Sequence, residues 1–237
     1  MNKQSNTYTV IYIFVMVVVV GAALALTSLA LKPRQQQNID ADKMKQILAA
    51  ALIAPQKGQV VDTYNQCVTS TFVVNAEGER IDGVDAFTVN VAEQSKLSAD
   101  SRELPVFEVR TADGATKYIL PVYGAGLWGP IWGYVAFNAD GTTIYGAYFA
   151  HQGETPGLGA EIEKPAFSSQ FEGKTVFKDG RFKPIAVVKA GQKPLDGEDY
   201  VDGISGGTIT SKGVGAMLDN CLSPYKAFLQ SLNNTNN

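Results

Sequence analysis

The sequence has a single histidine, His151, and only two cysteines, Cys67 and Cys221, in 237 residues. One histidine cannot form a histidine metal cluster, and without a Cys-x-x-Cys pair the chain has no zinc or iron–sulfur motif. The two cysteines lie far apart in the sequence, which leaves open whether they form a disulfide or remain two buried thiols. Metal and disulfide chemistry are therefore poor starting points for a function.

An excess of positive charge is also missing. Lys and Arg number 20 against 23 Asp and Glu, so the formal net charge is −3, and no stripe of basic residues occurs. Proteins that bind nucleic acids carry such a stripe because they must contact phosphates. The composition therefore argues against a nucleic-acid partner.

An uncharged apolar run from Val10 to Leu31 is the longest feature that is present. As a helix, residues 10–31 would span about 33 Å at roughly 1.5 Å per residue, enough to cross the hydrocarbon core of a bilayer. A cleaved signal peptide is the alternative, because an Ala-x-Ala string occurs at Ala23-Leu24-Ala25, but the apolar run continues well beyond it. We therefore expect an uncleaved anchor that crosses the membrane once.

Four basic residues, Lys32, Arg34, Lys43 and Lys45, follow this run, and only Lys3 precedes it. The positive-inside rule applied to these charges places the following domain in the cytoplasm, although the rule is weaker for a long translocated domain.

The remaining chain divides into a connecting helix and one domain. We expect a tail over residues 1–9, the membrane helix over 10–31, a connecting helix within 32–55 and the domain over 56–237. Asp40 or Asp42 is the expected N-cap of the connecting helix, which should run to about Leu52 and stop before Pro55.

Short β-like runs separated by turn residues fill the middle of the domain. Asp113-Gly114, Asp140-Gly141 and Asp179-Gly180 each lie between two such runs, which predicts hairpins and antiparallel pairing. Because long helical patterns occur only near the two ends, the predicted class is α+β. The predicted strands are Thr71–Val74, Phe107–Arg110, Lys117–Tyr123, Trp132–Phe137, Thr143–Phe149, Thr175–Phe177 and Ile185–Lys189.

A helix is predicted near the C-terminus, with Thr210 or Ser211 as its N-cap and Pro224 kinking or dividing it. It would begin a few residues beyond Thr208. Its apolar face comprises Val214, Met217, Leu218, Cys221, Leu222, Tyr225, Phe228 and Leu229.

The segment from Asp202 to Ser211 precedes this helix and holds three glycines and four hydroxyl side chains. Judged by its residues alone, it is either a plain loop or a seat for a phosphate. It resembles the flavinylation motif of the FMN-binding domain family, approximately Asp-x-x-Ser/Thr-Gly-Ala-Thr-x-Ser/Thr. The resemblance implies that FMN is esterified through its phosphate to Thr208.

We call residues 202–211 the attachment segment. By the resemblance, Asp202 is the acidic residue of the motif, Ser205 and Gly206 open its central element, and Gly207 stands where the family usually has alanine. The exchange is toward a smaller residue, so the expected close approach of the phosphate is preserved.

A second glycine-rich segment covers residues 124–129 and contains Trp128. It matches Gly-x-Gly-x-x-Gly, but a strand pattern follows it where a dinucleotide-binding fold requires a helix. It resembles the Gly-Leu-Trp segment of the C subunits of bacterial Na+-translocating NADH:quinone oxidoreductases. We expect a turn, the Trp128 turn, with Trp128 and Trp132 packed in the core rather than touching flavin.

A third segment, residues 151–159, resembles the Glu-Thr-Pro-Gly-Leu-Gly loop of those C subunits and of the G subunit of the electron-transport complex often called Rnf. We call it the Pro156 loop. By the resemblance, its main chain and side chains contact the flavin. The residues expected to bind the cofactor are Glu154, Thr155, Gly157, Leu158 and Gly159.

A hydrolase is an alternative of another class, because Ser205, His151 and an aspartate can be drawn as a triad. Ser205 has no Gly-x-Ser-x-Gly elbow, however. A membrane-tethered binding domain without a cofactor is a further alternative.

The order of these segments along the chain identifies it as a member of the family of C subunits, with the Rnf G subunit as the closest rival. The resemblance implies an electron carrier in a six-subunit pump that moves electrons from NADH toward quinone, with FMN attached by a flavin transferase that uses FAD. It also implies the bacterial inner membrane and a periplasmic domain, against the charge count above.

Overall fold

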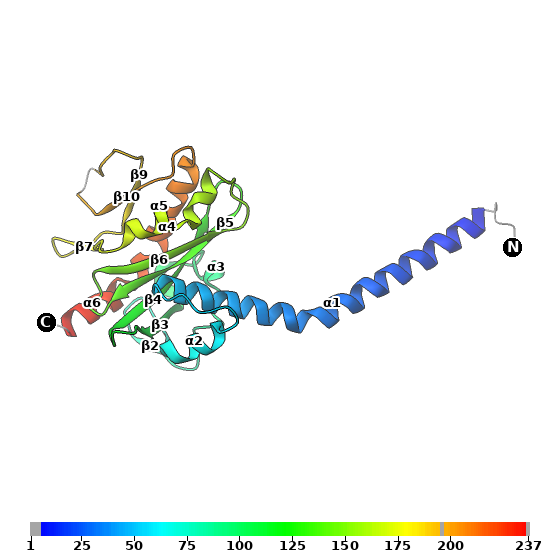
Figure 1. Ribbon diagram of the computed structural model, residues 1–237, viewed down its shortest axis with the longest axis horizontal. Coiled ribbons are helices and arrows are strands. Elements are labelled where there is room, and N and C mark those ends of the chain that lie inside the picture. The colour runs from blue at the N-terminus through cyan, green and yellow to red at the C-terminus, as the bar shows by residue number, and fades with distance from the viewer. Residues whose placement is uncertain (1–5, 195–196, 236–237) are drawn as a thin grey trace. The chain divides into compact units, whose positions relative to one another are not determined.

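The computed structural model describes residues 6–194 and 197–235. The chain divides into an N-terminal unit, residues 1–43, and a larger unit that begins at Met44. Figure 1 shows the elements of both units.

Helix α1 covers Asn6–Ala50 without a break, so the predicted connecting helix is not a separate element. Asp40 does not cap it; its carboxylate accepts a hydrogen bond from the side chain of Gln36 at 2.8 Å. Residues 6–9, predicted as part of a tail, are helical, whereas residues 1–5 lie outside the described residues. Within the described ranges, α1 is the one helix long and apolar enough to cross a membrane.

The end of α1 is set by Leu52, whose φ of 58° lies in the left-handed region. Ile53 N–H donates to the Leu48 carbonyl at 2.9 Å, and Leu52 N–H donates to the Ala49 carbonyl at 3.0 Å. These two bonds form a Schellman cap, which satisfies carbonyls that the helix end would otherwise leave unpaired. The helix therefore ends at Ala50, close to the predicted Leu52, and the cap at Leu52 ends it rather than Pro55.

The domain is built on a six-stranded antiparallel sheet in the order β2-β1-β3-β4-β5-β6. The hairpins predicted at Asp113-Gly114 and Asp140-Gly141 are confirmed as the β3–β4 and β5–β6 connections. The α+β class with an antiparallel sheet is therefore confirmed. The strands are β1 (Val68–Val74), β2 (Arg80–Ile81), β3 (Leu104–Arg110), β4 (Thr116–Ala125), β5 (Pro130–Asn138) and β6 (Ile144–His151).

Two small sheets lie outside it. The turn at Asp179-Gly180, both residues with positive φ, joins β7 (Phe177–Lys178) to β8 (Arg181–Phe182), so a hairpin forms there as predicted, but its second strand is not the predicted Ile185–Lys189. The predicted strand Thr175–Phe177 is wrong in its extent, because Thr175 makes only an isolated bridge with Thr143. The strand predicted over Ile185–Lys189 is β9 (Ala186–Val188), and it pairs in parallel with β10 (Tyr200–Asp202), which was not predicted.

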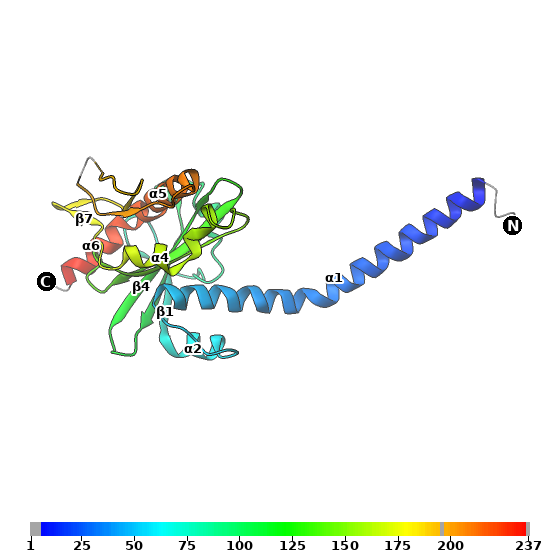
Figure 2. The same ribbon diagram turned by 45° about the horizontal axis from the view of Figure 1, so that its top comes forward.

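Side chains that alternate along the strands form a core on each face of the main sheet. One core lies under the C-terminal helices, and the other lies under the last turn of α1 and under α2 (Figure 2). The helices are α2 (Val60–Cys67), α3 (Val91–Gln94), α4 (Pro165–Ser168), α5 (Thr208–Leu222) and α6 (Lys226–Thr235), with short 3-10 turns η1 (Ala99–Ser101), η2 (Gly159–Glu163), η3 (Ser169–Phe171) and η4 (Ser223–Tyr225).

The predicted apolar face of the C-terminal helix is confirmed, since all eight of its side chains are buried. Pro224 divides the helix as predicted, because η4 separates α5 from α6. Helix α5 packs very closely on the end of β4: a Cβ added to Gly124 would collide with Met217, and one added to Gly213 would collide with the Ala125 carbonyl.

Both cysteines are free thiols. Cys67 packs against the core on one face of the sheet, and Cys221 belongs to the core on the other face. Cys67 is half-buried rather than fully buried. The alternative of a Cys67–Cys221 disulfide is therefore excluded.

Candidate functional site

The attachment segment begins in β10 and ends inside α5. Gly206 has a φ of 77°, which favours glycine. Gly207 is the N-cap residue, without any side chain to cap the helix, and Thr208 is the first helical residue. The predicted N-caps, Thr210 and Ser211, are wrong, and the helix begins at Thr208 rather than beyond it.

Thr210 and Ser211 are buried instead and hold the helix start to other segments. Ser211 Oγ accepts a hydrogen bond from the Ile204 amide at 2.8 Å, so it closes the turn ahead of the helix. Thr208, by contrast, is exposed. Within residues 6–194 and 197–235 its hydroxyl has no hydrogen-bond partner, so it is available for chemistry.

Glu154 joins the three predicted segments. Its side chain is 5% exposed; one oxygen accepts the Trp128 amide at 2.8 Å, and the other accepts the Thr210 hydroxyl at 2.5 Å. Burial raises the pKa of this carboxyl, but the bonds from Thr210, Trp128 and Leu127 together lower it below its usual value. Glu154 is thus an ionised link between the Pro156 loop, the Trp128 turn and α5.

The Pro156 loop lies directly against the attachment segment. A Cβ on Gly206 would overlap the side chain of Leu158, and one on Gly207 would come within 3.2 Å of the Gly159 amide nitrogen. Thr155 and Gly157 are exposed. The three segments that sequence reasoning singled out separately therefore form one site.

Trp128 is 69% exposed, which contradicts the expectation that it packs in the core. Its neighbour Leu127 is 48% exposed, and Leu158 and Ile209 are 43% and 56% exposed. Trp132 is half-buried, and its indole N–H donates to Gln46 Oε1 at 3.0 Å. The site therefore presents apolar side chains to its surroundings from the same three segments that Glu154 joins.

A cleft of about 470 Å³ is lined in part by Thr208. This is within the range of roughly 300–1,000 Å³ that is typical of ligand sites. Its far wall is the chain that follows β9, which no sequence pattern placed here. The lining residues are Val187, Val188, Lys189, Ala190, Gln192, Gly203, Ile204, Ser205, Gly206, Thr208, Ser211 and Lys212.

Asp202, the predicted acidic residue of the motif, is exposed at the end of β10. Its carboxylate accepts the Gly191 amide at 3.4 Å, and its main-chain N–H donates to Gln170 Oε1 at 2.9 Å. Asp202 thus holds the loop after β9 next to the attachment segment, although it is not among the described residues that line the cleft.

The hydrolase alternative gains no support. His151 Nδ1 accepts the Glu154 amide at 3.1 Å, and its Nε2 lies 3.7 Å from Glu163 Oε2. In the part of the chain that the structure describes, no hydrogen bond joins His151 to Ser205. The same residues contain no group of three His, Cys, Asp or Glu side chains that could hold a metal ion.

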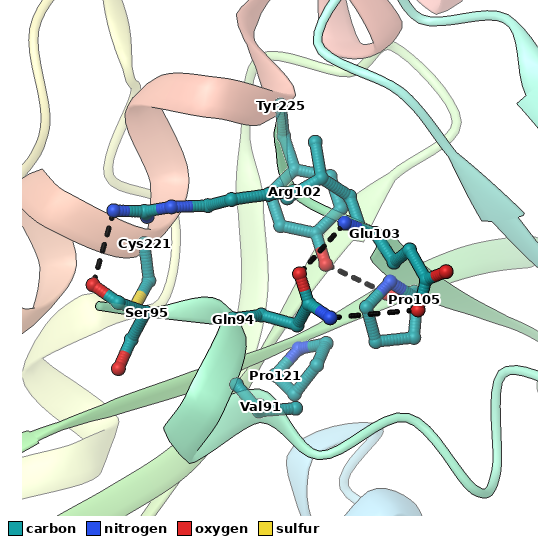
Figure 3. A pocket seen from close by; sticks show the side chains of 10 residues that line it. Val91, Gln94, Ser95, Arg102, Glu103, Pro105, Pro121, Cys221 and Tyr225 are labelled. Atoms are coloured by element: carbon teal, nitrogen blue, oxygen red, sulfur yellow. Dashed lines mark hydrogen bonds between the residues drawn. The ribbon is translucent and has the colours of Figure 1, made fainter. Parts of the chain in front are cut away.

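A second cavity, of about 20 Å³, lies at the other end of α5 (Figure 3). It has room for about one water molecule and not for a cofactor. Beside it, Arg102 is 7% exposed, and its guanidinium donates to the carbonyls of Ser95 and Leu97 and to both the carbonyl and the side chain of Asn220. Sequence reasoning missed Arg102, because an isolated arginine carries no signal of these distant partners.

Cys221 and Tyr225 line the same small cavity. Burial raises the pKa of the Cys221 thiol and raises the pKa of Tyr225 well above its usual value. The Tyr225 hydroxyl donates to the Pro105 carbonyl at 2.8 Å. These groups are neutral and paired, as expected for a structural region.

Comparisons with known proteins identify the family of the domain that contains these segments. The family model of the FMN-binding domain matches residues 126–223. The C subunit of the Na(+)-translocating NADH-quinone reductase of Vibrio vulnificus is 36% identical over 200 residues, which are 78% of this chain and 78% of the relative.

Two solved structures are similar as well. The C subunit of Parabacteroides distasonis is 51% identical, with a TM-score of 0.78 over 84% of this chain and 96% of that one. The NqrC protein of Shewanella oneidensis is 27% identical, with a TM-score of 0.68 over 82% of this chain and 98% of that one.

Proposed function

The chain belongs to the family of C subunits of the Na(+)-translocating NADH-quinone reductase, and from this premise we propose that it is a redox carrier whose FMN is bound covalently through Thr208. The observation that carries the proposal is the state of the Thr208 hydroxyl. It is exposed at the start of α5, while the neighbouring Thr210 and Ser211 are buried in structural hydrogen bonds.

The residues fit a phosphate ester at this position. Gly206 and Gly207 have no side chains, which lets the Pro156 loop pack closely against the turn that precedes Thr208. Thr208 is the first residue of α5, where unpaired amides and the helix dipole favour negative charge. The Ser205 hydroxyl lies in the same turn and is exposed, so it can donate to the phosphate or the ribityl chain.

The flavin ring would lie over the Pro156 loop. FMN itself supplies the one- and two-electron chemistry. Leu158, Trp128 and Ile209 are exposed apolar side chains of the three joined segments, and they would offer an apolar surface to one face of the ring. Thr155 and the main chain of Gly157 and Gly159 would bond its polar edge. Because Glu154 is fully engaged with protein groups, its contribution is to hold these segments in place.

The family membership favours this function over the rival one. The relatives described above are C subunits of the NADH-quinone reductase, so the G subunit of an Rnf complex remains the weaker interpretation. The chain would act with the other subunits of the six-subunit pump, take its FMN from FAD by a flavin transferase, and pass electrons from NADH toward quinone.

The apolar part of α1 would anchor the chain in the bacterial inner membrane. Residues 10–31 are exposed along their whole length, as expected for side chains that face lipid. The flavin domain would lie on the periplasmic side, where a covalent tether prevents loss of the cofactor. The basic residues after the span oppose this orientation, and a reporter fused at the C-terminus decides between the two. If the domain is periplasmic, the reporter should be accessible from the periplasm.

In-gel flavin fluorescence after denaturation tests the attachment. The full chain produced with a flavin transferase should give a fluorescent band, and the chain produced without it should not. Thr208→Ala should abolish the band, whereas Thr71→Ala, an exposed threonine on β1, should keep it. A band of unchanged intensity in Thr208→Ala would refute Thr208 as the attachment site.

A further inference from the structure

The cleft beside Thr208 combines two cations with an exposed hydroxyl. Lys189 and Lys212 line it together with Thr208, and none of its described lining residues is a carboxylate. This is unusual for a chain whose net charge is −3. A local excess of positive charge in a concave surface favours an anionic ligand.

Neither ammonium group is used by the fold. In the described ranges of the chain, neither Lys189 nor Lys212 forms an ion pair or a side-chain hydrogen bond, whereas Lys178 pairs with Asp199 at 2.6 Å. The nearest acidic residue of the attachment segment, Asp202, accepts a main-chain amide and does not line the cleft. The two lysines therefore line the same space, and within the described ranges their ammonium groups are available to a ligand.

The positions of both lysines are fixed by regular structure. Thr208 and Lys212 are four residues apart in α5, so their side chains share one face of the helix. Lys189 directly follows β9, and the Gly203 amide donates to the carbonyl of Val188 at 2.7 Å. The two walls of the cleft are therefore held together just beside Thr208.

We propose that this cleft is the anion subsite of the flavin site, in which Lys189 and Lys212 neutralise the phosphate that links FMN to Thr208. The inference rests on the proposed function. A phosphodiester on Thr208 carries one negative charge and lies one bond from the Thr208 oxygen, within the space that both lysines line. The flavin ring would then extend out of the cleft toward Leu158 and Trp128, which are not among its described lining residues.

If Lys189 and Lys212 neutralise the phosphate, replacing either lysine should reduce the gain in thermal stability that flavinylation confers. The full chain in detergent micelles is prepared with and without a flavin transferase, and the thermal midpoint is measured for both forms. Flavinylation should raise the midpoint of the wild type. In Lys189→Gln and Lys212→Gln this rise should be smaller by about 2–4 °C each, the size expected for one charge-assisted contact in a chain of this length.

Controls separate the subsite from general charge effects. Lys57→Gln removes an exposed positive charge far along the chain from the cleft and should leave the rise unchanged. Added salt should shrink the rise in the wild type more than in the double variant, because screening weakens a charge contact. If Gln variants are not flavinylated, Lys189→Arg and Lys212→Arg should restore the modification.

Two outcomes would overturn the subsite. One is an identical rise in the wild type and in all lysine variants, and the other is loss of flavinylation in the Gln and Arg variants alike. Neither would affect the proposed function, which fails only if the wild type itself carries no flavin on Thr208.

Discussion

The two ends of helix α5 are each held by a buried charged residue, but they differ in what they leave exposed. At the start, the Glu154 carboxylate binds Thr210 and the Trp128 amide, and Thr208 and the apolar side chains around it remain open. At the other end, the Arg102 guanidinium binds carbonyls around Asn220 beside a cavity of only about 20 Å³. Both signs complement the helix dipole.

The difference separates stability from chemistry within one helix. The Arg102 end is closed, because the guanidinium is buried and paired beside a cavity of only about 20 Å³, so it fixes the helix on the sheet. The Glu154 end is fixed equally well, but by a residue that reaches under the surface and leaves the Thr208 hydroxyl free. Substitutions at the Arg102 end should therefore destabilise the domain. Substitutions at the Glu154 end should destabilise it and also alter the flavin.

Arg102→Met should have the largest effect. It removes the arginine donor of the Leu97 and Asn220 carbonyls and one of the two side-chain donors to the Ser95 carbonyl, and we expect the free energy of unfolding to fall by about 3–5 kcal/mol. Denaturant unfolding of the full chain in detergent measures this loss, with the exposed Arg110→Met as control. The flavin content per folded molecule should not change. A loss below about 1 kcal/mol would contradict the structural role of Arg102.

Glu154→Ala should come next. It removes the acceptor of the Trp128 amide and the Thr210 hydroxyl, which should cost about 2–3 kcal/mol. Unlike the Arg102 variant, it should also loosen the Pro156 loop, so quenching of the bound flavin by solutes should increase. The exposed Glu172→Ala serves as control. Unfolding at lower denaturant with unchanged quenching would show that Glu154 does not position the flavin segments.

The adjacent glycines of the attachment segment should differ from each other. Gly206→Ala must place a side chain at positive φ and against Leu158, so it should cost about 1–2 kcal/mol and reduce flavinylation. Gly207 has a φ of −105°, which alanine adopts, and its Cβ would need neighbours to move only slightly. Gly207→Ala should stay within about 0.5 kcal/mol of the wild type and keep the flavin. Equal losses in both would contradict the turn geometry.

Acid should weaken the contacts of Glu154 at the start of α5 and leave the contacts of Arg102 at the other end unchanged. The folded-state pKa of Glu154 lies below its usual value, so its ionised form stabilises the protein above the unfolded pKa of about 4.3 and this contribution is lost as the pH falls. The stability gap between the wild type and Glu154→Gln, about 1 kcal/mol at pH 7, should therefore narrow below pH of about 4. A gap that widens in acid would reverse the assigned sign.

Local patterns predicted much of this comparison. The 3.6-residue period placed Val214 to Leu229 in the core, and the Asp-Gly pairs placed the hairpins. The sequence also singled out each of the three segments that meet at Thr208. The contacts that hold the two ends of α5 were nevertheless not predicted. Glu154 contacts Thr210 and Arg102 contacts Asn220 over long separations in the sequence, and no local pattern indicates such contacts.

The errors have physical reasons. Threonine and serine often cap helices, which is why Thr210 and Ser211 were predicted as N-caps. Here the Thr210 hydroxyl donates to Glu154 and the Ser211 hydroxyl accepts the Ile204 amide. Gly207 is the N-cap residue, and no side chain caps the helix. Trp128 was expected in the core because large aromatic side chains usually are buried, yet its turn projects from the end of the β4–β5 hairpin. The wall that carries Lys189 depends on parallel pairing of β9 with β10, which no turn signal announces.

Peptide mass spectrometry of the chain matured with a flavin transferase tests the central claim most directly. The peptide from Val201 to Lys212 should carry the mass of an FMN phosphoester, and fragmentation should place it on Thr208. An unmodified peptide, or an adduct on Ser205, Thr210 or Ser211, would contradict the assignment of the open end of α5 to covalent flavin.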